Sequence, residues 1–216
     1  MKAKIIKKPA IKLAGFLLKT KELTSFSLSR FSVKELTSYF WHDCITNGSL
    51  QKLNNEPFIK NNNQYGICVP VEKGDHEFEY VIGIEVKDGA DIPKEYHVCT
   101  IPEVMYAVFR TKPADNNNFA NVIDRAWVSI IMDWLPKSGY EYLDNKADFC
   151  FYDARYNNKK SNVCEIYLPV IKKLPNKSLI NEKTETKKCK NCLRRVDVHY
   201  NRCPYCRRDD FQFDSN

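Results

Sequence analysis

Hydrophobic and polar positions follow the same order of patterns twice within residues 1–173. In the first half an interrupted strand ends in IKLAGFLLKT (11–20), a helical pattern follows, and two strand patterns come at 65–71 and 78–86, joined by a charged turn. The second half repeats this order, with strand patterns at 96–111, 148–154 and 163–170. Two β-α-β-β modules predict an α+β domain with pseudo-twofold symmetry and a central groove, because binding sites favour interfaces between structural units.

The helix of each half carries its own boundary signals. Ser32 and Glu35 form a capping box at the start of the first helix. The second helix has candidate caps at 116–118 and ends where Pro136 and Gly139 follow. The apolar positions at helical spacing are Val33, Leu36, Phe40 and Cys44 in the first helix, and Phe119, Val122, Ile123, Ala126, Trp127, Ile130 and Trp134 in the second.

The nine cysteines divide into two groups. Five lie in apolar stretches of the main domain, where a free thiol behaves as a small hydrophobe, and four lie close together near the C-terminus. This usage indicates a reducing compartment. The basic N-terminus lacks the apolar region of a secretory signal, and the most apolar helical run (126–135) is too short to span a bilayer. We therefore expect a cytoplasmic protein with no membrane partner.

The C-terminal cysteines form two CxxC pairs, CKNC and CPYC, with ten residues between them. Two such knuckles complete a tetrahedral site, and a short segment poor in Leu, Ile and Val needs a metal in order to fold. We predict one structural Zn²⁺ per chain in a ribbon over 189–216, after a polar linker at 174–188. Two redox dithiols or a chance cluster are the alternatives. The predicted zinc ligands are Cys189, Cys192, Cys203 and Cys206.

The net charge of +7 is divided between the two parts of the chain. Residues 1–182 contain 25 Lys and Arg against 22 Asp and Glu, and residues 183–216 contain 9 against 5. The main domain is therefore nearly neutral and lacks the electrostatic signature of a nucleic-acid-binding protein. The ribbon offers a few arginines to phosphate, so we expect nucleic-acid binding to be absent or weak.

The strand VCEIYLPV (163–170) contains the most unusual candidate residue, the carboxylate of Glu165. Strand alternation places Glu165 and Tyr167 on one face, with Cys164 and Ile166 on the face that packs under helices. A partly buried carboxylate among aromatic rings suits a lipophilic cation, and it also suits proton transfer. A glutamate that reaches solvent at the rim is the simpler alternative. The candidate ligand-binding residues are Glu165, Tyr167, Tyr106, Cys150, Tyr152, Trp127 and Trp134.

The succession VIGIEV, TIPEVMYAVFR, AWVSIIMDWLPKSGYE, ADFCFYD and EIYLPV resembles the GyrI-like family, the effector-binding domain of AraC-type and MerR-type multidrug-responsive regulators. The resemblance covers roughly residues 1–171. It implies two β-α-β-β modules around a groove, drug-like and often cationic aromatic ligands, and a pocket glutamate at Glu165. Many relatives carry a second glutamate where this chain has Cys150, which implies a less acidic pocket. We also expect a stand-alone form, with a zinc ribbon in place of a DNA-reading domain.

Three functions are compatible with these observations. The first is a small-molecule binding protein for lipophilic, cationic aromatic compounds. The second is a hydrolase of reactive electrophilic compounds that uses Glu165 with Tyr167 or Tyr106, although no independent catalytic signature is present. The third is a protein-interaction module resembling the gyrase-inhibitor members, with the ribbon as contact surface for a protein partner.

Overall fold

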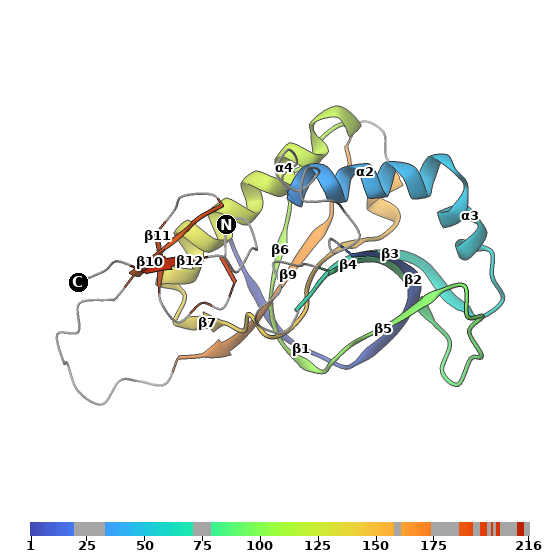
Figure 1. The fold of residues 1–216 in the computed structure, drawn as a ribbon, viewed down its shortest axis with the longest axis horizontal. Helices are drawn as coiled ribbons and strands as arrows, with labels where there is room; N and C mark the ends of the chain where they lie inside the picture. The colour runs from blue at the N-terminus through green and yellow to red at the C-terminus, as the bar shows by residue number, and fades with distance from the viewer. Residues whose placement is uncertain are drawn as a thin grey trace.

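The main domain is organised by one antiparallel sheet (Figure 1). The computed structural model describes residues 1–19, 33–70, 79–157, 161–173, 186–191, 195–197, 200, 202–203 and 211–213. Within them the sheet order is β1-β6-β9-β8-β3-β4-β2-β5, and β7 also pairs with β9. The strands are β1 (Lys4–Lys8), β2 (Ile11–Lys19), β3 (Ile59–Val69), β4 (Glu79–Val86), β5 (His97–Ile101), β6 (Val104–Arg110), β7 (Tyr140–Tyr142), β8 (Asp148–Tyr152) and β9 (Glu165–Lys172). The predicted α+β class is confirmed.

Each half of the chain occupies one end of this sheet, and each sends one strand to the other end. Strands β2, β3 and β4 of the first half lie together, as do β6, β8 and β9 of the second. Strand β1 pairs with β6, and β5 pairs with β2, so the outermost strands are exchanged between the halves. The central joint is the antiparallel pairing of β3 with β8. Strands from both halves therefore meet at the centre of a single sheet.

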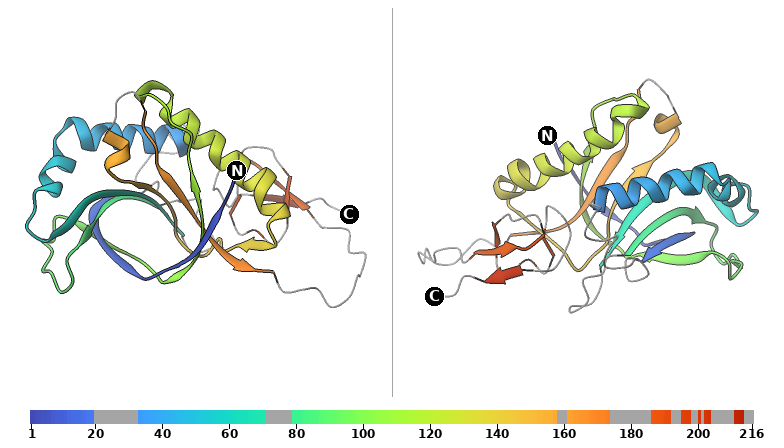
Figure 2. Two further views of the ribbon diagram at one scale, coloured as in Figure 1. Left: turned by 180° about the vertical axis from the view of Figure 1, so that it is seen from behind. Right: turned by 45° about the horizontal axis from the view of Figure 1, so that its top comes forward.

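The helices cover one face of the sheet (Figures 1 and 2). Helices α2 (Val33–Thr46) and α3 (Ser49–Asn54) pack on β3 and β4 through residues such as Leu36, Cys44 and Leu53, and α4 (Asn116–Ser129) packs on the second half through Phe119 and Ala126. Helix α3 and strand β7 are absent from the sequence prediction. None of the helices in the described ranges combines the length and apolarity that a membrane span requires.

Helix α4 differs from its predicted form at both ends. Its N-cap is Asp115, one residue before the expected asparagines, and the Asp115 carboxylate accepts a hydrogen bond of 3.0 Å from the backbone N–H of Asn118. After Ser129 the chain continues as a π-helical turn (Ile130–Trp134) and a 3₁₀ turn (Leu135–Lys137). A π turn adds a residue to the helical repeat, so Ile131 joins Ile130 in the core. The predicted stop at Gly139 is confirmed by its left-handed φ of 72°.

The described C-terminal residues form a second small sheet, β11-β10-β12, that contacts the main domain. Its strands are β10 (Thr186–Cys189), β11 (Arg195–Asp197) and β12 (Phe211–Phe213), so β10 begins inside the stretch expected to be linker. The buried Arg202 donates a hydrogen bond of 2.8 Å to the backbone oxygen of Asp144, and Tyr200 lies 6.4 Å from the Tyr142 ring. The small sheet is therefore docked beside β7 (Figure 2).

Several sequence predictions concern residues outside the described ranges. These are the Ser32 cap, the charged turn at 72–75, most of the predicted linker, and two of the four predicted zinc ligands, Cys192 and Cys206. They stay predictions.

The pairing of β2 with β4 requires a residue without a side chain at Gly15. Gly15 lies opposite Gly83, and a Cβ on Gly15 would overlap the backbone oxygen of Ile82. A Cβ on Gly83 would come no closer than 3.3 Å to the Leu13 Cβ and 3.4 Å to the backbone oxygen of Ala14. We therefore expect Gly15→Ala to lower the free energy of unfolding by about 3 kcal/mol or more, and Gly83→Ala by clearly less, in urea titrations. Equal losses in the two variants would contradict this close approach.

Candidate functional site

Five aromatic rings form a continuous layer on the sheet face opposite the helices. We call this layer the aromatic face; its residues are Tyr65 on β3, Tyr106 on β6, Phe149 and Phe151 on β8, and Tyr167 on β9. The rings of Phe149 and Tyr167 are stacked at 4.5 Å and 12°, because the two residues are directly paired between β8 and β9. Tyr106 meets both of these rings, at 5.3 and 5.8 Å, and Tyr65 meets Phe149 and Phe151 at 5.7 and 5.1 Å. Four of these rings are buried, with 2% of Tyr65, 0% of Tyr106, 1% of Phe149 and 7% of Tyr167 exposed, and Phe151 is partly buried.

Glu165 lies at the border of the aromatic face and has two polar partners. Its side chain is 24% exposed, so it is neither fully buried nor free in solvent. The Tyr167 hydroxyl donates a hydrogen bond of 3.1 Å to Oε2, and an Arg155 guanidinium nitrogen lies 3.0 Å from Oε1. Glu165 is therefore a partly buried carboxylate that already has protein partners. The charge of Glu165 is partly balanced before any ligand binds.

Arg155 holds the two neighbouring carboxylates together. It lies on a 3₁₀ turn, Ala154–Asn157, and its Nε is 2.8 and 2.9 Å from the two carboxylate oxygens of Asp153. One further guanidinium nitrogen is 2.6 Å from Asp153 and 3.0 Å from Glu165. The hydrogen bonds from Arg155 are the main reason that the pKa of Asp153 is lowered, against the opposing effect of burial. The sequence analysis did not identify Arg155, because the sequence gives no indication that the 3₁₀ turn lies beside β9.

Two further charged residues, Lys8 on β1 and Glu85 on β4, also border the aromatic face. The Lys8 ammonium lies 5.5 Å from the centre of the Tyr167 ring. Glu85 on β4 is 17% exposed and lies 2.8 Å from the Lys60 Nζ. Burial raises the pKa of Glu85, but hydrogen bonds from Lys60 and Asn61 and the nearby positive charges lower it by more. The site therefore contains carboxylates from both halves of the sheet, each with a protein cation nearby.

The tyrosine hydroxyls of the aromatic face remain protonated at neutral pH. Burial raises the pKa of Tyr65, Tyr106 and Tyr167, and nearby carboxylates raise it further. The Tyr106 hydroxyl donates a hydrogen bond of 3.2 Å to the backbone oxygen of Ala147. The Tyr106 and Tyr167 hydroxyls therefore already donate to acceptors within the protein, and as neutral phenols they are poor bases.

Of the seven predicted ligand-binding residues, the structure brings together three, Glu165, Tyr167 and Tyr106. The other four, Cys150, Tyr152, Trp127 and Trp134, lie on the opposite side of the sheet, in the core beneath α4. The reason is strand alternation in β8, where Phe149 and Phe151 share the face of Tyr167 and the intervening residues point toward the helix. The pairing of Phe149 with Tyr167 decides which residues of β8 face the helices. The sequence of β8 alone does not reveal this pairing.

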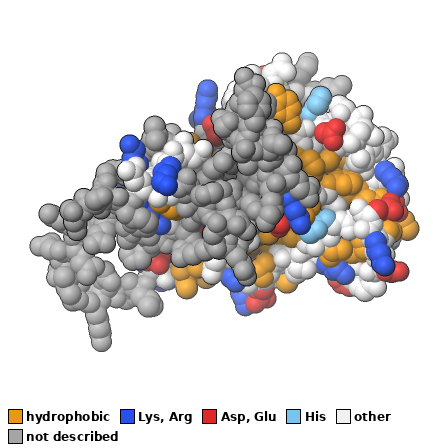
Figure 3. Space-filling view, viewed as in Figure 1, with side chains coloured by type: hydrophobic (Ala, Val, Ile, Leu, Met, Phe, Trp, Pro, Cys, Tyr) orange, Lys and Arg blue, Asp and Glu red, His pale blue; other side chains and the backbone are white. Residues whose placement is uncertain are grey.

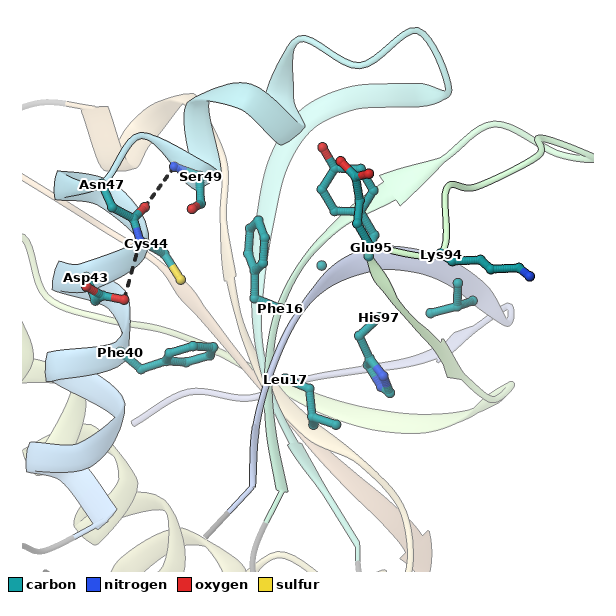
Figure 4. Close-up of a pocket in the computed structure, with 13 residues that line it drawn as sticks. Phe16, Leu17, Phe40, Asp43, Cys44, Asn47, Ser49, Lys94, Glu95 and His97 are labelled. Atoms are coloured by element: carbon teal, nitrogen blue, oxygen red, sulfur yellow. Dashed lines mark hydrogen bonds between the residues drawn. The ribbon is translucent and has the colours of Figure 1, made fainter. Parts of the chain in front are cut away.

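A separate cavity of about 590 Å³ lies between α2 and the β2–β5 edge (Figure 4). Its apolar lining includes Phe16, Phe40 and Cys44, and burial raises the pKa of the Cys44 thiol to about 11. The carboxylate of Glu95 at its rim is paired with Lys52 at 2.8 Å. This cavity is lined by β2 and α2 of the first half and by β5 of the second, and it is distinct from the aromatic face.

The surface seen in Figure 3 carries charges of both signs. Among the coloured residues, Lys and Arg side chains alternate with Asp and Glu side chains around exposed hydrophobic ones, and neither sign gathers into a large patch on this face. Figure 3 therefore shows no basic stripe of the kind that follows a phosphate backbone in the described part of this face.

The C-terminal sheet contains two of the predicted zinc ligands in its interior. Cys189 and Cys203 are both fully buried and belong to one small cluster with Val196, against which Tyr200 and Phe211 pack. The described residues contain no group of three or more possible ligands, since Cys192 and Cys206 lie outside them. Two buried sulfur atoms in such a small core fit one end of a four-thiolate site.

Comparison with known proteins identifies the main domain. Residues 4–170 match the family described as Cass2, integron-associated effector binding protein. The match covers most of the chain, so the main domain is an effector-binding domain and the chain belongs to this family. The resemblance to GyrI-like effector-binding domains is thereby confirmed.

Individual relatives agree with this assignment. The transcriptional regulator BrlR of Pseudomonas aeruginosa is 32% identical over 110 residues, which are 49% of this chain and 37% of BrlR, so the chain matches little more than a third of that regulator. A putative transcription regulation protein from Staphylococcus aureus MU50 has a TM-score of 0.55 at 18% identity, over 79% of this chain and 98% of that one. SAV2435, solved bound to tetraphenylphosphonium, has a TM-score of 0.56 at 20% identity, over 79% and 94%. At these identities the two structures show a common fold.

The Arg155 cluster gives a pH-dependent prediction. Arg155→Gln removes the cation that lowers the pKa of Asp153, so the variant should lose about 1 kcal/mol of stability at pH 7. Because the folded-state pKa is lowered, this stabilisation is complete above the ordinary aspartate pKa of about 3.9 and is lost as the pH falls through the lowered value. Urea unfolding at several pH values measures it. The exposed Arg125→Gln is the control; a loss that is independent of pH would contradict the ion-pair account.

Proposed function

We propose that this chain binds lipophilic aromatic small molecules, with cations as the main class, at the aromatic face beside Glu165. The observation that carries the proposal is a carboxylate set at the border of five contacting rings. Ring faces attract cations and bury apolar ligand surface, and a carboxylate adds charge. Membership of an effector-binding family supports this, as does a structural relative that was solved with a lipophilic aromatic cation.

The ion pair with Arg155 sets the scale of the electrostatic contribution. A carboxylate that already has a cationic partner attracts a second cation less strongly than an isolated one. The rings of Tyr167 and its neighbours are therefore expected to supply most of the affinity, and Glu165 a smaller share of it. We prefer this face to the cavity near Phe40, because the Glu95 carboxylate there is 56% exposed, whereas Glu165 is 24% exposed.

Glu165→Gln tests the site directly. The variant keeps the shape of the side chain and removes its charge, so it should weaken tetraphenylphosphonium binding by about 1–2 kcal/mol, measured by calorimetry. A neutral compound of similar size, triphenylphosphine oxide, should bind almost unchanged.

Two control variants test whether the ligand binds at the aromatic face or elsewhere on the protein. Glu141 is an exposed carboxylate on β7, and Phe40 lines the separate cavity. Glu141→Gln and Phe40→Leu should both leave tetraphenylphosphonium affinity unchanged. A loss in Phe40→Leu with none in Glu165→Gln would place the ligand in the cavity and contradict the proposal.

A hydrolase remains the second candidate, because the hydrogen bond between Tyr167 and Glu165 is the contact that an acid–base pair needs. Binding alone predicts that the ligand is recovered unchanged by mass spectrometry after incubation. Conversion of an electrophilic ligand by wild type and not by Glu165→Gln would favour the hydrolase.

We also propose that Cys189, Cys192, Cys203 and Cys206 hold one structural zinc ion. The buried positions of Cys189 and Cys203 in one cluster support this, as does the scarcity of other apolar residues in the small sheet. Zinc held by four thiolates would supply folding energy and leave no position for a reacting water.

Zinc removal gives the corresponding prediction. Freshly purified protein should contain about one zinc per chain. Cys203→Ser should release the metal and unfold the small sheet, with the loss of the Arg202 contact to Asp144, whereas the half-buried Cys99→Ser should retain the metal. Elemental analysis measures the stoichiometry, and metal-free wild-type protein with an ordered C-terminal sheet would contradict the proposal.

The remaining proposals concern symmetry, partners and location. The exchanged outer strands support a pseudo-twofold relation between the halves around a central groove.

We expect weak nucleic-acid binding that falls steeply with salt, because the net charge of residues 1–182 is small. A protein partner would contact the ribbon, and cysteine usage favours the cytoplasm.

A further inference from the structure

Lys8 is the last residue of strand β1, at the edge of the sheet. Strand β1 pairs only with β6 among the described strands, in a register that sets Ile6 opposite Tyr106 and Lys8 opposite Val104. Side chains two residues apart share a face, so Lys8 lies on the same face as Ile6, which packs against the aromatic face. Lys7 lies on the other face and pairs with Glu103 at 2.6 Å.

The Lys8 ammonium is held beside a ring and near two carboxylates. It lies 5.5 Å from the centre of the Tyr167 ring, within the range of a cation–π contact. Burial lowers the pKa of Lys8, while the negative charges of Glu85 and Glu165 act in the opposite sense. Within the described residues it forms no ion pair, so its attraction to the two carboxylates acts over a longer distance.

We infer that Lys8 is an internal cation that competes with cationic ligands for the Tyr167 ring and so sets the charge selectivity of the site. The inference rests on the proposed function, since it concerns the same site. A ligand cation that approaches Tyr167 meets like charge from Lys8, and it must displace the ammonium into water. A ligand anion of the same shape gains attraction from Lys8 instead.

Lys8 fits this role better than Arg155. Arg155 is bound to Asp153 at three short distances and to Glu165 at a fourth, so displacing it would break several charged hydrogen bonds. Lys8 has a flexible stem on an edge strand, and its ammonium regains hydration when it leaves the ring. Displacement of Lys8 therefore costs less than displacement of Arg155.

The test uses two probes of matched shape and opposite charge, tetraphenylphosphonium and tetraphenylborate. Affinities for both are measured by calorimetry in wild type and in Lys8→Met, which keeps an unbranched side chain of similar length. Loss of the competing charge should strengthen tetraphenylphosphonium binding by about tenfold and weaken tetraphenylborate binding by a similar factor. The matched controls are Lys8→Arg, which should behave as wild type, and Lys7→Met, which should leave both affinities unchanged.

Each outcome distinguishes this inference from the proposed function. If wild type binds tetraphenylphosphonium but Lys8→Met has the same ratio of cation to anion affinity, Lys8 does not compete and the inference alone is wrong. If Lys7→Met changes that ratio as much as Lys8→Met does, the effect is one of net charge and the inference is also wrong. If neither probe binds wild type or Lys8→Met, the proposed function fails, and the inference fails with it.

Discussion

The pairing of β8 with β3 on one side and β9 on the other holds this domain together and also builds its candidate site. Strand β8 belongs to the second half of the chain and lies at the centre of the sheet. It pairs there with β3, which belongs to the first half. The same register sets Phe149 beside Tyr167 and opposite Ile67, so the rings stack where the two halves meet. A shift of one residue in β8 would turn Phe149 and Phe151 toward the helices and expose a thiol in their place. The core and the site therefore depend on one register.

Charge balance is the second feature of the site. Glu165 and Asp153 both pair with Arg155, and Glu85 pairs with Lys60. The carboxylates that border the aromatic face are therefore already paired with protein cations. Pairing of this kind lowers the cost of keeping carboxylates at partly buried positions. Under the proposed function, a cationic ligand therefore gains less from charge than an unpaired carboxylate would supply, and we expect ring contacts and competition with Lys8 to decide selectivity.

The C-terminal sheet contacts the main domain, although the sequence predicts a linker between the two. Its buried Arg202 reaches the backbone of Asp144, between β7 and β8, and Cys203 follows directly. The β7–β8 connection leads into Phe149, so the docking contact lies five residues from the stacked ring pair. The small sheet therefore contacts the connection between β7 and β8, close in sequence to the aromatic face.

The sequence by itself determined most of the strands, the two long helices and the family. Apolar periodicity predicted the order of strands and the two long helices, and alternation in VCEIYLPV placed Glu165 and Tyr167 together, because these patterns follow from the local geometry of helix and strand. Only the tertiary structure decided which face of β8 meets Tyr167, which cations balance Glu165 and Glu85, and that Lys8 lies over a ring far along the chain. Register between strands depends on contacts between residues distant in sequence, and a single strand with apolar residues on both faces leaves its phase open.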